Sequence, residues 1–197
     1  MAVVEIPDEI LRSNAKRYIQ LLRDTNRTGM EDFLRYLITT DFFKAPASTR
    51  YHLCCEGGLC QHSLNVYDLL KLKIDSGLLE IPADSLAITT LCHDICKANF
   101  YTIENRWRKD ENGKWEGYKA YGVNDELPIG HGEKSCYLLQ QYIALSPMEY
   151  AMIRYHMGRE AGVMGADAFG NAANRWPGVA AIHTADLEAS FILETRE

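Results

Sequence analysis

The sequence predicts a mostly α-helical protein that carries one small β-hairpin. Apolar residues recur at helical spacing along most of the 197 residues, whereas one stretch alternates and centres on Asn112-Gly113, a dipeptide typical of hairpin turns. Hydrophobic residues make up 47% and charged residues 24% of the chain, as in folded globular proteins. We therefore expect one domain over residues 1–197, a compact helical bundle with a hairpin inserted at about 101–121.

Two helices are expected near the amino terminus, at residues 8–24 and 29–40. The first has its apolar residues on one side at helical spacing. At the start of the second, Thr28 and Glu31 have the spacing of a capping box.

The middle of the chain is expected to contain two more helices and the hairpin. A third helix should start after the glycine pair at 57–58 and include residues 59–74, and a fourth should span 84–100. The alternation that follows marks the two strands of the hairpin.

Two helices are expected to follow the hairpin directly. The first covers residues 132–145. Ser146, Pro147 and Glu149 then supply a capping box with proline at the first helical position, so a further helix should begin there and end at Gly158.

The carboxyl-terminal part is expected to contain a loop and one last helix. Residues 159–176 are rich in glycine and alanine, which we interpret as a loop. The last helix should begin near Pro177 and continue to about residue 194.

Composition narrows the class of protein. The net charge is −6, which argues against a protein that grips long nucleic acid, since such binding depends on clustered Lys and Arg. Six cysteines without any CxxC pair indicate reduced thiols rather than disulfides. No apolar run is long enough for a membrane span, and the first residues lack the pattern of a signal peptide. We expect a cytoplasmic protein.

The stretch LCHDICK at residues 91–97 places a histidine and an aspartate among residues that look like a helix core. Charged groups are rarely buried unless they are paired or bind an ion. Packing of the helices would bring several such positions together, and histidine with carboxylate is a common set of metal ligands. Five of the six histidines fall on or beside separate predicted helices: His62, His93, His131, His156 and His183.

The motifs GGLCQHS, LCHDICK, GHGEKS, RYHMG and HTADLEAS occur in an order that is similar to the HD-domain metal-dependent phosphohydrolase superfamily. The similarity covers about residues 45–195. The defining residues of that family, a histidine, an adjacent His-Asp pair and a distant aspartate, fall on His62, His93, Asp94 and Asp186. The resemblance implies the compact HD-type helical bundle.

Further features narrow the resemblance. His131 and His156 lie in the interval where members with two metals carry extra histidines. The glycine pair at 57–58 and Lys97 match members with a lysine three residues after the aspartate. Cys96 departs from the pattern, because many of those relatives have glycine there.

The resemblance implies a site for two divalent ions. Manganese, iron, nickel, cobalt, zinc and magnesium are all compatible with histidine and carboxylate ligands. The first ion would be held by His62, His93, Asp94 and Asp186. The second would be held by Asp94, His131 and His156, so that Asp94 bridges the two ions.

Other polar residues are assigned roles around these ligands. Lys97 and Asp94 are the expected catalytic residues, with Lys97 contacting a phosphate oxygen; the alternative is an exposed lysine that interacts with the helix dipole. Lys134 and His52 are expected to bind substrate; the alternatives are a solvated lysine and a plain loop histidine. His183, one turn before Asp186, is expected to orient a ligand.

The expected function is hydrolysis of a phosphoester bond in a nucleotide or another small phosphorylated substrate. That substrate is the one partner expected. Three alternatives stay open: a 3′–5′ exonuclease-like phosphodiesterase on short oligonucleotides, a non-catalytic nucleotide-binding module, and an oxygenase with two irons. The hairpin aromatics Trp107, Trp115 and Tyr118 could cover a base or sugar, or could pack only across the strands.

Overall fold

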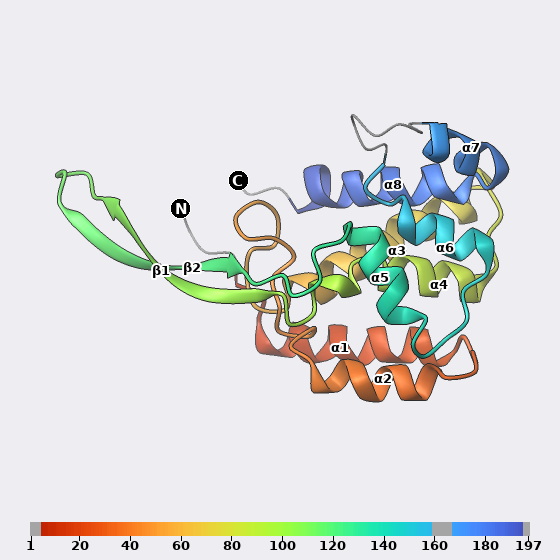
Figure 1. The fold of residues 1–197 in the computed structure, drawn as a ribbon, viewed down its shortest axis with the longest axis horizontal. Coiled ribbons are helices and arrows are strands. Elements are labelled where there is room, and N and C mark those ends of the chain that lie inside the picture. The colour runs from red at the N-terminus through yellow and green to blue at the C-terminus, as the bar shows by residue number, and fades with distance from the viewer. Residues whose placement is uncertain (1–4, 159–166, 195–197) are drawn as a thin grey trace.

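The computed structural model describes residues 5–158 and 167–194, and these residues are mostly helical with one small antiparallel hairpin, as predicted. Figure 1 shows the hairpin projecting from one end of a body of packed helices. The elements in chain order are α1 (Asp8–Arg23), α2 (Met30–Thr39), α3 (Gly58–Asp75), α4 (Ala83–Cys92), β1 (Tyr101–Lys109), β2 (Trp115–Val123), α5 (His131–Leu139), α6 (Pro147–Arg154), α7 (Asp167–Arg175) and α8 (Gly178–Glu188).

Helices α3 and α4 occupy the middle of the bundle, with α1 and α2 on one side of them and α8 on the other (Figure 1). Every residue of α4 from Ser85 to Cys92 is buried, as expected of a central helix. The hydroxyls of Thr89 and Thr90 donate to the carbonyls of Ser85 and Leu86. Since its threonine hydroxyls are hydrogen-bonded in this way, α4 can be buried, and the residues that follow it lie in the interior.

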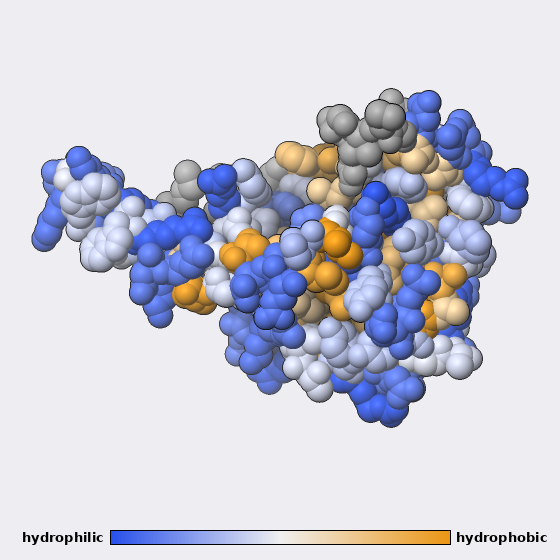
Figure 2. Space-filling view, viewed as in Figure 1, coloured by the Kyte–Doolittle hydropathy of each residue, from blue (hydrophilic) through white to orange (hydrophobic). Residues whose placement is uncertain are grey.

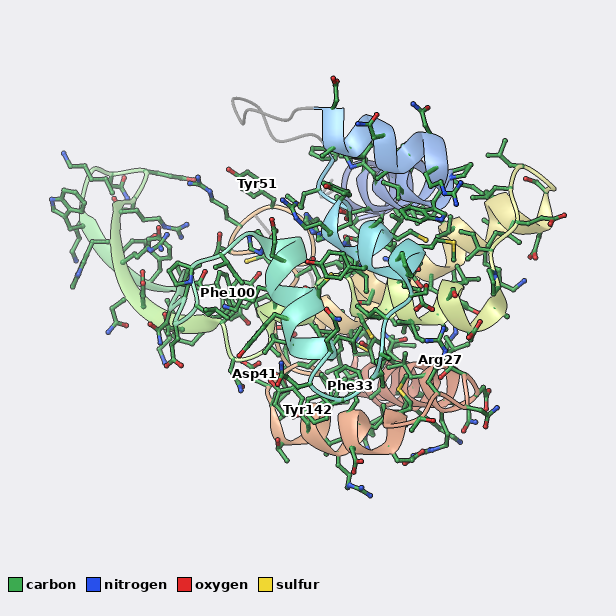
Figure 3. All side chains as sticks on the ribbon, turned by 45° about the vertical axis from the view of Figure 1, so that its right-hand side comes forward. Arg27, Phe33, Asp41, Tyr51, Phe100 and Tyr142 are labelled. Atoms are coloured by element: carbon green, nitrogen blue, oxygen red, sulfur yellow. The ribbon has the colours of Figure 1, made fainter. Side chains whose placement is uncertain are left out.

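Two apolar clusters hold the bundle together. The larger joins α1, α2, α3, α4, α5 and α6, and the smaller joins α3, α4, α6 and α8, so that α3, α4 and α6 take part in both. At the edge of the larger cluster the rings of Phe33 and Tyr142 lie 5.8 Å apart, which ties α2 to the segment after α5 (Figure 3). The metal-ligand candidates lie on elements from both clusters.

The expectation of one continuous helix over 84–100 was wrong. Helix α4 ends at Cys92, and a single 3-10 turn, Ile95–Lys97, follows. The carbonyl of Thr90 accepts a hydrogen bond from the His93 side chain, and the carbonyl of Leu91 accepts one from the Tyr18 hydroxyl. The helix stops just before the His-Asp pair, at the point where these side chains donate to its last carbonyls.

The hairpin confirms the predicted strands, although its turn differs from the type that Asn112-Gly113 favours. The strands pair from Tyr101 with Val123 to Lys109 with Trp115. The amide of Gly113 donates to the carbonyl of Asp110, and only Gly113 has a positive φ (76°) in this turn. The turn is therefore of the type I kind followed by a left-handed glycine, in place of a two-residue turn. Figure 2 shows the hairpin as an arm of mainly hydrophilic colour.

Two of the predicted helix starts had different outcomes. The capping box at the start of α6 is confirmed, because Ser146 accepts from the Glu149 amide and the Glu149 side chain accepts from the Ser146 amide. The one predicted for α2 was wrong: Gly29, with a φ of 87°, is the N-cap and no side chain caps the helix. The Gly29 Cβ position lies 2.0 Å from the carbonyl oxygen of Tyr142, so a larger residue would not fit there.

The carboxyl-terminal half contains shorter helices than predicted and one more of them. Helix α5 ends at Leu139 and α6 at Arg154. Part of the predicted loop at 159–176 is helix α7, since Phe169 packs its ring against Tyr155; residues 159–166 of that prediction lie outside the described residues. None of the described helices is long and apolar enough to cross a membrane.

Candidate metal centre

Four side chains that the motifs predicted as ligands converge in the interior of the bundle. His62 comes from α3, His93 and Asp94 from the segment after α4, and Asp186 from α8. His62 Nε2 lies 3.1 Å from Asp186 Oδ1 and 3.3 Å from His93 Nε2. His93 Nε2 lies 3.5 Å from Asp94 Oδ2. The fold therefore brings together residues that are more than 120 positions apart in the chain.

A glycine pair sets the position of His62. Gly57 has a φ of 74° and precedes the first residue of α3. The Cβ position of Gly58 lies 2.1 Å from the carbonyl oxygen of Leu53, so only glycine lets the preceding loop pack this closely on the start of the helix. His62 lies one turn further along α3 and faces inward.

Three buried histidines are held in the same tautomer by their Nδ1 atoms. Nδ1 of His93 lies 2.7 Å from the Thr90 carbonyl, and Nδ1 of His156 lies 2.7 Å from the Ile153 carbonyl. A carbonyl oxygen can only accept, so both Nδ1 atoms carry the proton. His62 Nδ1 lies 3.0 Å from a carboxylate oxygen of Glu194, which is also an acceptor. In the neutral form of each ring, Nε2 is then left free to offer a lone pair to the centre.

The centre requires positive charge. In the neutral histidines the lone pairs of His62 and His93 face each other, and two carboxylates stand beside them. Burial lowers the pKa of His62, but the hydrogen bonds that its ring donates to Asp186 and Glu194 outweigh it and raise the pKa to about 10. Burial alone would raise the pKa of Asp94, but Lys97 and His93 hold it well below its ordinary value. A proton or a metal ion satisfies this arrangement, and the carboxylates stay ionised in either case.

The two oxygens of Asp94 face different neighbours. Oδ2 lies toward His93 and Lys97, while Oδ1 lies 3.5 Å from Nε2 of His156. Both Asp94 Oδ1 and His156 Nε2 are buried without a hydrogen-bond partner. Buried polar atoms normally have a partner, so this pair marks a place that a cation fits.

Groups of ligand atoms with the spacing needed to hold a metal ion surround Asp94. In each group the atoms lie within 4.8 Å of one another. The donors are imidazole nitrogens, carboxylate oxygens and one thiol, a set that suits divalent transition metals. The groups are His62, His93 and Asp94; His93, His156 and Asp186; Asp94, Cys96 and His131; and His52, His62 and Glu194.

Lys97 faces the centre and is not the exposed lysine of the alternative interpretation. Its Nζ atom lies 2.7 Å from Asp94 Oδ2 and 3.0 Å from the carbonyl of Ala47. The side chain is 15% exposed. Burial lowers the pKa of Lys97, but Asp94 outweighs it and raises the pKa above its ordinary value, so the ammonium stays charged.

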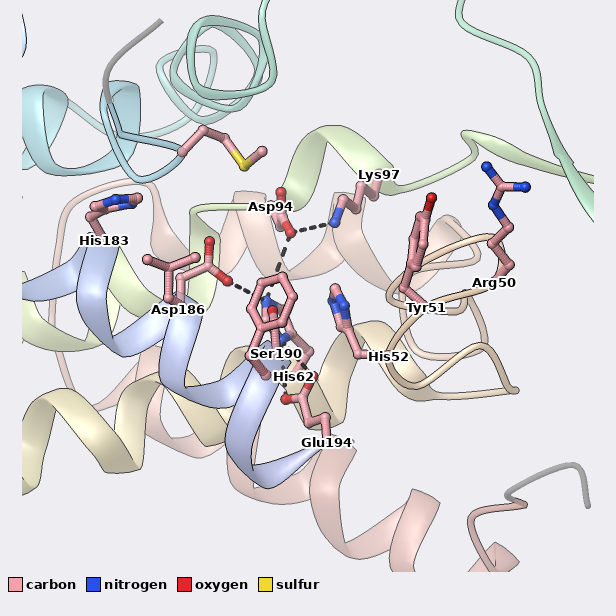
Figure 4. Close-up of a pocket in the computed structure, with 13 residues that line it drawn as sticks. Arg50, Tyr51, His52, His62, Asp94, Lys97, His183, Asp186, Ser190 and Glu194 are labelled. Atoms are coloured by element: carbon pink, nitrogen blue, oxygen red, sulfur yellow. Dashed lines mark hydrogen bonds and ion pairs between the residues drawn. The ribbon is translucent and has the colours of Figure 1, made fainter. Parts of the chain in front are cut away.

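A cavity of about 580 Å³ opens onto this cluster, as Figure 4 shows. His62, Asp94, Lys97, Asp186 and Glu194 are the charged and ligating groups at its inner end. Its outer wall is apolar and contains Tyr51, Met157, Leu187 and Phe191, which are 43–72% exposed, beside Arg50. No described residue of the hairpin lines the cavity, so the hairpin aromatics do not cover it in this structure.

The other predicted site residues have different positions. His52 lines the cavity, 5.0 Å from the His62 ring between centroids, and burial lowers its pKa to about 4. His183 also lines it, and Nδ1 of His183 donates to the main-chain carbonyl of His156 rather than to a ligand side chain. Lys134 pairs with Asp125 and is not among the described residues that line the cavity.

Gly158 lets His183 reach this position. It has a φ of 84°, and its Cβ position lies 2.6 Å from the His183 ring. A side chain at 158 would therefore displace His183 from the cavity wall.

Sequence reasoning missed Glu194. This carboxylate is buried, accepts from His62 Nδ1 and also from the amide of Asn65. It lies eight residues after Asp186, which is a little over two helical turns, so helix periodicity offered a weak signal. A π-helical turn, Ala189–Leu193, extends α8 and positions it.

Comparisons of the chain with family models, with curated proteins and with solved structures found no match.

Proposed function

We propose that this protein is a metal-dependent phosphohydrolase of the HD type that cleaves a phosphoester bond in a nucleotide or another small phosphorylated compound. The observation that carries the proposal is the convergence of three histidine Nε2 atoms with Asp94 and Asp186 at the inner end of an open cavity. This geometry agrees with the order of the motifs in the sequence.

His62, His93, Asp94 and Asp186 would hold one divalent ion, and Asp94, His131 and His156 a second. Divalent ions bound there supply a Lewis acid for phosphoryl oxygens and an activated water for hydrolysis. The protein fixes the ligands beforehand. Nδ1 of each buried histidine is held by an acceptor, so the rings present Nε2 without reorganisation.

Lys97 has the position of a phosphate contact. Its ammonium group lies on the cavity side of Asp94 and keeps its charge in the buried site. A phosphoryl group that enters the cavity would meet this point charge beside the metal ligands. The charge that develops on phosphoryl oxygens during cleavage would then be stabilised by this ammonium group.

The apolar outer wall favours a substrate with an aromatic or apolar part. Tyr51 and Phe191 offer exposed rings at the mouth, while the polar groups lie at the inner end. A nucleotide matches this division, with its base at the wall and its phosphate inside. Among the described residues that line the cavity, Arg50 and Lys97 are the only lysines or arginines. That favours one small phosphorylated compound over the backbone of an oligonucleotide.

The test is hydrolysis by purified protein that has been stripped of metal and given back one divalent ion at a time. The substrates are a panel of nucleoside phosphates, a short oligonucleotide, and chromogenic phosphate monoesters and diesters. We expect metal-dependent hydrolysis that Asp94→Ala removes and that Asp75→Ala, an exposed carboxylate of α3 paired with Lys71, does not. Hydrolysis of none of these compounds with any ion would overturn the proposal. Oxygen uptake in the iron-loaded protein would support the oxygenase instead.

A further inference from the structure

Cys96 lies beside the second group of ligand candidates. It belongs to the 3-10 turn after Asp94 and is 1% exposed. Its Sγ atom lies 3.5 Å from Nδ1 of His131. Asp94, Cys96 and His131 each offer one ligand atom, and these three atoms lie within 4.8 Å of one another. A thiol, an imidazole and a carboxylate thus face one another at the junction between this turn and the start of α5.

A second observation shows that these groups are incomplete as they stand. Asp94 Oδ1 and His156 Nε2 are buried, 3.5 Å apart, and neither has a hydrogen-bond partner. A thiol that only donated a hydrogen bond to His131 would leave both atoms unsatisfied. Asp94 belongs to one ligand group with Cys96 and His131, and its Oδ1 atom faces His156 Nε2, so a cation bound at Asp94 would give these atoms a partner.

We propose that Cys96 is a thiolate ligand of the second metal ion, together with Asp94, His131 and His156. The separation of its sulfur from the His131 nitrogen agrees with this role. Zinc bonds of about 2.3 Å to sulfur and about 2.0 Å to nitrogen, at a tetrahedral angle, place the two atoms roughly 3.5 Å apart. As the sulfur–metal bond forms, the thiol proton passes to the solvent, and no electrons are transferred.

This ligand determines which metal the second position accepts. A thiolate favours zinc, cobalt or iron(II), whereas carboxylate and water ligands suit magnesium and manganese. The inference rests on the metal centre of the proposed function, but it does not depend on which phosphoester is cleaved. On this inference, the cysteine at 96, where many HD relatives have glycine, changes which metal the second position prefers.

Cobalt(II) titration of the metal-free protein tests the assignment, because a cobalt–thiolate bond gives a charge-transfer band in the near ultraviolet. We expect the band in the parent protein and its loss in Cys96→Ser. Loss of a residue that only hydrogen-bonds to a metal ligand lowers metal affinity by roughly 10–100-fold. Loss of a ligand should lower the affinity of the second position for cobalt by at least as much. Cys136→Ser is the matched control, since Cys136 is also buried and its thiol donates only to the carbonyl of Tyr150.

X-ray absorption of the zinc-loaded parent protein gives a readout that needs no variant. It should contain a sulfur neighbour at about 2.3 Å. Persistence of the cobalt band in Cys96→Ser, or absence of sulfur from the zinc spectrum, would overturn the inference. Metal-dependent hydrolysis without a thiolate band would support the proposed function and overturn the assignment of Cys96. A thiolate band in a protein that hydrolyses no phosphoester would support the assignment of Cys96 and overturn the proposed function.

Discussion

A carboxylate oxygen of Glu194 lies 3.0 Å from Nδ1 of His62, and both residues are buried. The contact joins the end of the chain to the third helix. It fixes the tautomer of His62 and makes its Nε2 atom a stronger donor to a cation.

We expect Glu194→Gln to weaken metal binding without unfolding the protein. The amide oxygen can still accept from Nδ1, but it lacks the negative charge that favours a bound cation. The affinity for the first ion should fall by about 10–100-fold, as measured by competition with a chelator. Glu188→Gln is the control, because Glu188 pairs with Lys73 away from the ligands. Equal affinities in parent and Glu194→Gln would contradict the role given to Glu194.

Glu194 also illustrates what the sequence could and could not predict. His62, His93, Asp94 and Asp186 were predicted because their motifs are local and ordered along the chain. Glu194 belongs to no motif, and its contact with His62 depends on how a π-helical turn packs against a helix 132 positions away. Such a contact follows from tertiary packing, which the spacing of residues does not encode.

The fold was predictable to a similar degree. Strongly periodic segments and the capping box of Ser146 and Glu149 identified most helices. Helix α7 was mistaken for a loop because its segment is rich in glycine and alanine, and its position depends on the packing of Phe169 against Tyr155 and His183. The break after Cys92 was missed because the apolar pattern continues past it, while the contacts made there by Tyr18 and His93 follow from tertiary packing.

Asp94→Asn should destabilise the metal-free protein. Repulsion among buried carboxylates alone would predict the opposite, but Asp94 is surrounded by positive partners and Lys97 Nζ lies 2.7 Å from its Oδ2. Removing the charge leaves the Lys97 ammonium without its carboxylate, at a cost of about 1–3 kcal/mol in the free energy of unfolding. Denaturant unfolding of both metal-free proteins measures it.

The same variant should lose the stabilisation that metal provides. Added divalent ion should raise the melting temperature of the parent and leave that of Asp94→Asn unchanged. Asp68→Asn is the control, because Asp68 forms an exposed pair with Arg17 and should change stability by at most about 1 kcal/mol. Equal thermal shifts with metal in parent and Asp94→Asn would remove Asp94 from the ligand set.

Lys97→Met should separate catalysis from metal binding. The substitution keeps the length of the side chain but removes a positive charge next to Asp94, so divalent ions should bind at least as tightly as in the parent. The rate at saturating substrate should fall by about 10²–10³, since a preorganised contact to the transferring phosphoryl group is lost. Lys71→Met, on the exposed side of α3, is the control. A kcat equal to that of the parent would show that Lys97 serves only as the partner of Asp94.

The apolar wall of the cavity should determine which substrates bind well. Phe191 and Tyr51 are 72% and 67% exposed at the mouth. Covering large apolar side chains is favourable, so a bound group that covers these two rings would bind more tightly. A nucleotide base that stacks on these rings should bind more weakly to Phe191→Ala or Tyr51→Ala. The expected loss of binding free energy is about 1–3 kcal/mol per stacked base, as for base–aromatic stacking in nucleic-acid binding. The KM for a nucleotide should then rise by at least about fivefold with little change in kcat, while the KM for a small alkyl phosphate should stay the same. Ile38→Ala, which removes an exposed apolar side chain of α2, is the control for a general effect on the surface. An equal rise in KM for both substrates would mean that the wall shapes the entrance without recognising a base.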